Sequence, residues 1–116
     1  MLKKALSIQP MMIGWRRDLH THPELGFQEF RTAGKIAEIM RGFGYDVRTG
    51  IGKTGVVAEL GAGKPIVAIR ADMDALPIQE ANEVPYKSIQ DGIMHACGHD
   101  AHVAYPLQFM CPLHNL

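Results

Sequence analysis

The stretch Pro65–Arg70, with the sequence PIVAIR, is the part of the chain that decides the fold class. Residues 66–69 are all apolar, whereas a strand with one face in water alternates apolar and polar side chains. A strand that is apolar on both faces is usually an inner strand of a sheet covered by helices. The sequence therefore predicts an α/β fold, with an exposed apolar face if part of the sheet lies outside this chain.

Helices and short strands are predicted on the N-terminal side of this stretch. Apolar residues at i, i+3 and i+7 predict an amphipathic helix over residues 9–20. A clearer pattern of the same kind predicts a second helix over residues 29–43, followed by Gly44, where a helix C-terminus favours glycine. Short apolar runs at 45–48 and 56–60, separated by glycine-rich turns, predict two strands.

The last part of the chain shows no long periodic pattern. Residues 72–98 contain scattered proline, glycine and polar residues, which predicts a loop. A third helix can begin at residues 100–104, but Pro106 and Pro112 follow closely, and proline inside a helix removes a hydrogen bond and clashes with the preceding turn. We therefore predict an irregular tail over residues 105–116.

The composition is that of one ordinary globular domain. The chain has 116 residues, of which 47% are hydrophobic and 21% charged, and 12 basic residues balance 12 acidic ones. The absence of a basic stripe excludes a nucleic-acid partner. The apolar run at 66–69 is far short of the roughly 20 residues that span a bilayer, which excludes a membrane location. Without a recognisable export signal we expect a cytoplasmic protein with reduced cysteines.

Two conspicuous motifs have structural explanations. Residues 50–55 match the G-x-G-x-x-G spelling of a dinucleotide site, but that site needs a following helix, whereas residues 56–60 predict a strand. We therefore interpret the glycines as a turn. His20 and His22 lie at the end of the first predicted helix, where an imidazole commonly satisfies last-turn carbonyls. We interpret this pair as structural, with metal binding as the alternative.

The stretch MHACGHDAH at residues 94–102 is the richest in reactive side chains, with three histidines, one cysteine and one aspartate. Cys97 and His99 flank a single flexible glycine, so both can turn toward one ion and supply the sulfur and nitrogen ligands that Zn²⁺ accepts. A polar loop with a reactive cysteine and no metal is the alternative. Two ligands do not complete a site. The others would come from His102, Cys111, His20, His22 or residues outside this chain.

Two aspartates directly follow the predicted strand 65–70. Ligands of open α/β sheets bind beyond the carboxyl ends of the strands, which is where Asp72 and Asp74 are expected. A carboxylate beside a metal-bound histidine fixes its tautomer and raises its basicity. A solvated turn in which Arg70 pairs with one carboxylate is the alternative.

Taken together, four ordered blocks resemble the N-terminal part of the metal-dependent aminoacylase-type amidohydrolases. These zinc-peptidase-like enzymes include hippurate hydrolase, N-acyl-amino-acid amidohydrolases and plant auxin-conjugate hydrolases. The blocks are residues 17–27, 52–58, 70–77 and 94–102. The resemblance implies an α/β catalytic domain, with helices packed on a mixed sheet, that is interrupted by a dimerisation domain and cleaves the amide between an acyl group and an amino acid.

The resemblance also implies roles for individual residues. Cys97 and His99 match metal ligands, and Asp74 matches a catalytic acid that orients the site. Asp72 stands where related peptidases carry a metal-binding histidine, so Asp72 and His102 are candidates for supporting the ligands rather than for binding metal. The implied cofactors are divalent ions (Mn, Zn, Co or Ni), two per intact site. The implied partner is a small-molecule N-acyl amino acid, and intact relatives are expected to be homo-oligomers.

The resemblance stops near residue 104. In the family the glutamate pair with the general base, the remaining histidine ligands and the dimerisation domain follow the cysteine motif. We therefore expect residues 1–104 to be part of a catalytic domain, residues 105–116 to be an atypical tail from a truncation or frameshift, and this chain alone to be inactive. The competing hypothesis is a small structural zinc module. Its ligands would be Cys97, His99, His102 and Cys111.

Overall fold

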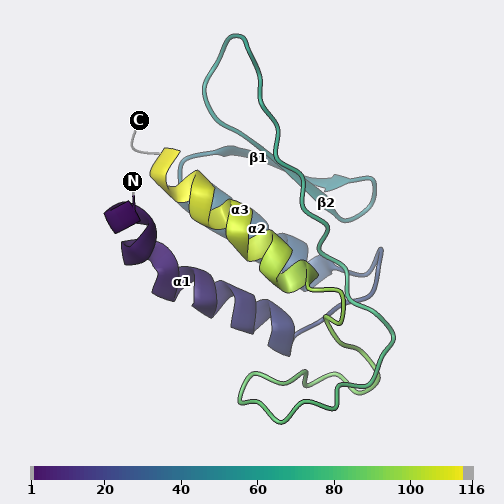
Figure 1. Ribbon diagram of the computed structural model, residues 1–116. Coiled ribbons are helices and arrows are strands. Elements are labelled where there is room, and N and C mark those ends of the chain that lie inside the picture. Colours follow the sequence, from purple (N-terminus) through teal and green to yellow (C-terminus); the bar gives the residue numbers. More distant parts are fainter. Residues whose placement is uncertain (1, 114–116) are drawn as a thin grey trace.

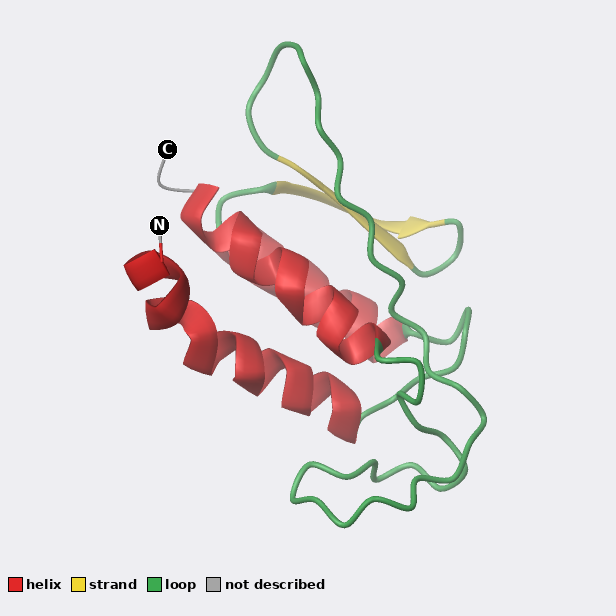
Figure 2. Ribbon diagram, viewed as in Figure 1, coloured by secondary structure: helices red, strands yellow, loops and turns green. Residues whose placement is uncertain are grey.

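The computed structural model describes residues 2–113 and has an α/β architecture, as predicted (Figures 1 and 2). Helices α1 and α3 lie side by side, α2 packs behind α3, and a two-stranded hairpin packs on α2. A long loop joins the hairpin to α3 (Figure 2). The elements, in chain order, are α1 (Leu2–Thr21), α2 (Phe30–Gly42), β1 (Asp46–Ile51), β2 (Gly55–Glu59) and α3 (His99–Leu113).

The core lies where the three helices meet. Its buried cluster takes Leu19 from α1, Met40 from α2, Tyr45 from the turn after α2, and Val103 and Leu107 from α3. Most of the apolar face predicted for the second helix is buried on α2, but Phe30 at the start of that face is exposed. The helix predicted over residues 9–20 is helical throughout, but α1 begins much earlier than residue 9. Packing of all three helices against one another therefore positions the start of α3.

The glycine motif at residues 50–55 forms the turn of the hairpin, as predicted. Strands β1 and β2 pair antiparallel, with Asp46 opposite Glu59. A Cβ on Gly55 would lie 2.5 Å from the carbonyl oxygen of Ile51, so only glycine fits this close approach. The turn leads into a strand rather than a helix, which removes the dinucleotide alternative.

The prediction of a buried strand at residues 65–70 is wrong for this structure. Ile66 and Val67 are 80% and 87% exposed, and the segment forms no strand. Within residues 2–113 the sheet consists of β1 and β2 alone and is antiparallel, not mixed. Among the described residues no strand pairs with this segment. Its apolar side chains form an exposed apolar face.

The prediction of an irregular tail from residue 105 is also wrong as far as Leu113, and residues 114–116 lie outside the described part. Helix α3 continues through Pro106. Val103, Ala104 and Leu107 are buried, and Leu107 lies after the proline. Burial of this face against the other helices outweighs the loss of one backbone hydrogen bond at Pro106.

Within residues 2–113 no helix combines the length and the apolar character needed to cross a bilayer.

Candidate metal centre

Two isolated β-bridges bring the aspartate segment to the cysteine motif. Leu25 pairs in parallel with Ala75, whose amide donates to the Glu24 carbonyl at 2.8 Å. Leu76 pairs antiparallel with Met94 through two backbone hydrogen bonds of 2.9 and 3.0 Å. Because Met94 opens the cysteine motif, these bridges place Asp74 beside it although the two lie far apart in sequence.

His99 and Asp74 form the central contact of the candidate site. Nδ1 of His99 lies 2.9 Å from Oδ1 of Asp74 and 3.0 Å from the Asp74 carbonyl oxygen. Nδ1–H is therefore the donor, and the lone pair of the imidazole is on Nε2. A histidine that binds metal through one nitrogen usually donates its other N–H to a carboxylate or a carbonyl. His99 has both acceptors in place.

Cys97 lies in a tight turn just before α3. Gly98 has φ +80°, a conformation that favours glycine, and its amide donates to the His95 carbonyl at 3.3 Å. The Cys97 thiol is free and exposed. Across residues 2–113 no group of three or more metal-ligating side chains is gathered. The described part of the chain thus offers two candidate ligands, and further ligands must come from elsewhere.

The four residues of the structural zinc module do not converge. Cys111 follows His99 on the same helix, and at about 1.5 Å per residue the two positions are roughly 18 Å apart along the axis. Burial of the Leu107 face holds α3 in this conformation. The structure is therefore incompatible with a closed site that uses both Cys97 and Cys111.

The remaining candidates lie at the margin of the site. Oδ1 of Asp72 pairs with Arg70 at 2.7 Å on the surface, which is the solvated turn considered as the alternative. His102 is exposed, and its ring centroid lies 6.3 Å from that of His99. Nδ1 of His22 donates to the Asp18 carbonyl at 2.8 Å, so the structural interpretation of His22 is confirmed.

A buried polar cluster adjoins the site. Its members are Arg16, His20, Glu80 and Asp100. Nδ1 of His20 lies 2.7 Å from Oδ2 of Asp100, and Nε2 lies 2.9 Å from Oε1 of Glu80. Nε of Arg16 donates to the same Asp100 oxygen at 2.8 Å. His20, Glu80 and Asp100 are each at most 3% exposed. Sequence reasoning missed Glu80, because it stands in a polar loop stretch with no motif around it.

Glu80 ties the long loop to the cluster. Burial alone would raise the pKa of Glu80, but hydrogen bonds from the Ser88 amide, His20 and Asn82 outweigh it and hold the pKa below the ordinary value. The Ser88 amide donates to Oε2 of Glu80 at 2.7 Å. Glu80 is therefore an ionised carboxylate at neutral pH.

His95 is a buried histidine with unused hydrogen-bonding groups. It is 4% exposed, and neither ring nitrogen has a partner among the described residues. Oδ1 of Asp100 is also buried without a partner among them. Burial lowers the pKa of His95, which favours the neutral imidazole. A buried water is the usual partner for such groups.

Known proteins share both the sequence and the fold. Residues 68–116 match the family model for Peptidase family M20/M25/M40. The chain is 53% identical over 95 residues to an N-acyl-L-amino acid amidohydrolase of Geobacillus stearothermophilus. It is 46% identical over 104 residues to a hippurate hydrolase of Campylobacter jejuni. The chain is therefore similar in sequence to members of the M20 peptidase family.

A solved M20 structure has the same fold as this chain. The YXEP protein of Bacillus subtilis, described as a dinuclear metal binding peptidase from the M20 family, matches with a TM-score of 0.87 and 44% identity. That match covers 94% of this chain and 31% of the YXEP chain. The matches to the two curated relatives cover 80% and 88% of this chain but only 26% and 27% of those proteins. The chain spans about a quarter of the length of these M20 relatives.

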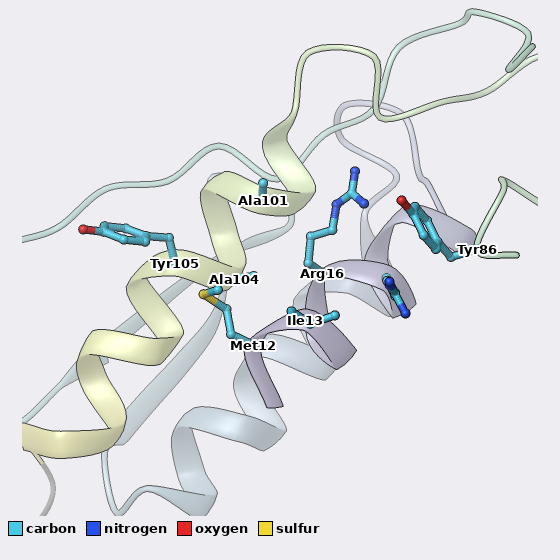
Figure 3. Close-up of a pocket in the computed structure, with 8 residues that line it drawn as sticks. Met12, Ile13, Arg16, Tyr86, Ala101, Ala104 and Tyr105 are labelled. Carbon is cyan, nitrogen blue, oxygen red and sulfur yellow. The ribbon is translucent and has the colours of Figure 1, made fainter. Parts of the chain in front are cut away.

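An open groove of about 480 Å³ lies between α1 and α3 (Figure 3). Arg16 extends from α1 toward Tyr86, whereas the ring of Tyr105 points away from α1. Cys97, His99 and Asp74 do not line this groove, so it is not the candidate metal centre. Its lining residues are Met12, Ile13, Arg16, Arg17, Tyr86, Ala101, Ala104 and Tyr105.

The lowered pKa of Glu80 predicts acid sensitivity. As the pH falls below the ordinary value of 4.5, the unfolded chain takes up the proton first, so the free energy of unfolding decreases until the pH has passed the lower pKa of the folded state. Glu80→Gln should lose less stability than wild type between pH about 5 and about 3. Urea unfolding at a series of pH values measures this difference. Glu83→Gln, at an exposed neighbouring position, is the control, and equal pH slopes for Glu80→Gln and wild type would contradict the prediction.

Proposed function

We propose that this chain supplies part of the metal centre of an M20 amidohydrolase that cleaves N-acyl amino acids. The main observation behind this proposal is the contact between His99 and Asp74, which directs Nε2 of His99 away from its carboxylate partner. His99 lies two residues after Cys97, whose thiol is exposed. The names of the relatives support amide hydrolysis and N-acyl amino acid substrates. The dinuclear description of the YXEP protein supports divalent metal ions.

The residues present fit a divalent ion. Cys97 and His99 would hold it, the first as a thiolate and the second through Nε2. A bound ion would polarise the amide carbonyl and lower the pKa of a water molecule. Asp74 accepts the Nδ1 proton of His99, which fixes the tautomer and makes Nε2 a stronger donor to metal. We assign Asp74 to this orienting role, and Asp72 and His102 to support around it.

The proposal also covers the domain, the location, the assembly and the metal content of the whole enzyme. Residues 1–104 belong to a catalytic domain, and the first two ligands lie in the turn before α3 and at the first residue of α3. The enzyme is cytoplasmic and acts as a homo-oligomer on a small-molecule substrate. Its ions are Mn, Zn, Co or Ni, two per intact site. Transfer of a proton from water to the leaving amine needs a general base. In the family resemblance this base is a glutamate outside the present residues.

Cobalt binding tests the ligand assignment. Titration of the chain with Co²⁺ should produce a thiolate-to-cobalt charge-transfer absorption, which Cys97→Ser should abolish and His99→Asn should weaken at least tenfold in affinity. Cys111→Ser is the matched control and should bind cobalt as wild type does. Loss of the absorption in Cys111→Ser instead would favour the structural zinc module.

Amine release tests the reaction class. Hippurate and acetyl amino acids are incubated with the cobalt-loaded protein, and any hydrolysis should disappear in Cys97→Ser. Hydrolysis that Cys97→Ser leaves unchanged would contradict the assigned site. The absence of hydrolysis is the result expected when the general base is supplied from outside these residues.

A further inference from the structure

His20 lies between two carboxylates in the buried polar cluster. Its ring nitrogens lie 2.7 Å from Oδ2 of Asp100 and 2.9 Å from Oε1 of Glu80. The guanidinium of Arg16 contacts the same Asp100 oxygen and lies 3.4 Å from Nδ1 of His20. The imidazole therefore joins a carboxylate of the long loop to a carboxylate in the first turn of α3.

The cluster is closed to water except at Arg16. Arg16 is the partly exposed member, whereas the side chains of His20, Glu80 and Asp100 are removed from water. Buried polar groups are costly unless they have hydrogen-bond partners, so removing one member leaves its partner uncompensated in the interior.

The cluster acts on the metal site through adjacent residues of the chain. His99 and Asp100 are consecutive in the first turn of α3. His99 is held on one side by Asp74, and Asp100 is held on the other by α1, through His20. Glu80, the second partner of His20, fixes the long loop through the Ser88 amide. The direction in which His99 points thus depends on contacts that lie outside the metal site.

We propose that His20 is a positioning residue of the metal centre: its imidazole joins α1, the long loop and the first turn of α3, and so sets Cys97 and His99 in the arrangement that binds metal. This role deepens the proposed function and rests on it. His20 itself touches neither candidate ligand. It acts through Asp100 and through the backbone that Asp100 shares with His99.

Three variants test this role. His20→Gln keeps a polar side chain but places its amide oxygen against one of the two carboxylates. His22→Gln makes the same change two residues further on, where the imidazole contacts a backbone carbonyl outside the cluster. The double variant His20→Gln/Glu80→Gln replaces the carboxylate at position 80 with an amide and so removes this mismatch. In it the new amide at position 20 can donate to Asp100 and accept from the new amide at position 80, whose oxygen remains for the Ser88 amide.

Cobalt affinity per folded molecule is the first readout. Residues that orient a metal ligand from outside typically change metal affinity about ten- to a hundredfold, and we expect a loss of this size in His20→Gln. The thiolate-to-cobalt absorption should also shift in wavelength. His22→Gln should stay within about twofold of wild type, and the double variant should recover most of the affinity. A merely structural His20 would lower stability and leave cobalt affinity per folded molecule unchanged, which would overturn the proposal.

Amide hydrogen exchange without metal is the second readout. Exchange at residues 98–103 should accelerate in His20→Gln, remain at the wild-type rate in His22→Gln, and slow again in the double variant. If the wild-type chain shows no cobalt-thiolate absorption, the proposed function fails while this readout still tests the positioning role. Unchanged exchange in His20→Gln overturns the role. Exchange in the double variant as fast as in His20→Gln also overturns the positioning role.

Discussion

Asp100→Asn is expected to lower the free energy of unfolding by about 3–5 kcal/mol, the range found when one partner of a buried ion pair is removed. Oδ2 of Asp100 accepts from both His20 and Arg16, and the carboxylate is 1% exposed. Arg16 can reach water after the change, whereas His20 cannot. Asparagine fills the same space, so the loss is one of charge rather than of packing. Because a domain of this size is stable by only about 5–15 kcal/mol, the variant should be largely unfolded at moderate urea concentrations.

The control for Asp100→Asn is an exposed ion pair in the hairpin. Arg48 and Glu59 lie 3.1 Å apart with both side chains more than half exposed. Glu59→Gln should change the free energy of unfolding by less than about 1 kcal/mol, because surface pairs are screened by water. Urea denaturation followed by circular dichroism measures both variants. If Asp100→Asn were as mild as Glu59→Gln, Asp100 would not be held in a buried ion pair.

Local patterns in the sequence were sufficient for the elements with local causes. Helix α2 follows from its apolar spacing, and the hairpin follows from glycines at positions where only glycine fits. The start of α3 was predicted, but its continuation was not, since the proline rule considers the backbone alone. The burial of Val103 and Leu107 depends on α1 and α2, and no local window contains those helices.

The segment at residues 66–69 shows the opposite limit. Its composition predicts a strand that is buried on both faces, yet Ile66 and Val67 are exposed. The apolar composition of a segment indicates that its side chains favour burial, but tertiary structure decides which elements cover them. Among residues 2–113 no such elements cover residues 66–69. The prediction of its surroundings failed, whereas the α/β class that it indicated is correct.

The candidate site also contains residues that the sequence could predict and residues that it could not. Cys97, His99 and Asp74 could be singled out from sequence because they stand in dense motifs that resemble a family. The contact between His99 and Asp74 then forms once the fold brings these two motifs together. The buried polar cluster had no such signal, because His20 lies 60 positions from Glu80 and 80 from Asp100. Its members are ordinary polar residues until the fold removes them from water.

The second large effect is expected from Leu107→Ala, which tests whether the end of α3 belongs to the core. Leu107 is 4% exposed and packs in the cluster with Leu19 and Met40. Truncation of a buried leucine removes apolar contacts and leaves a cavity, at a cost of about 2–5 kcal/mol in the free energy of unfolding. Because the residue follows Pro106, a loss of this size requires the helix to continue past the proline.

Phe109 on the same helix provides the matched control for Leu107→Ala. It is 50% exposed, and its ring meets that of Tyr105 at a centroid distance of 4.9 Å. Phe109→Ala should therefore cost no more than about 1.5 kcal/mol, the upper range for an aromatic pair. Urea unfolding of both variants distinguishes the two faces of α3. Equal and small effects would mean that residues 105–113 do not pack as described and that the irregular tail predicted from the prolines is the better description.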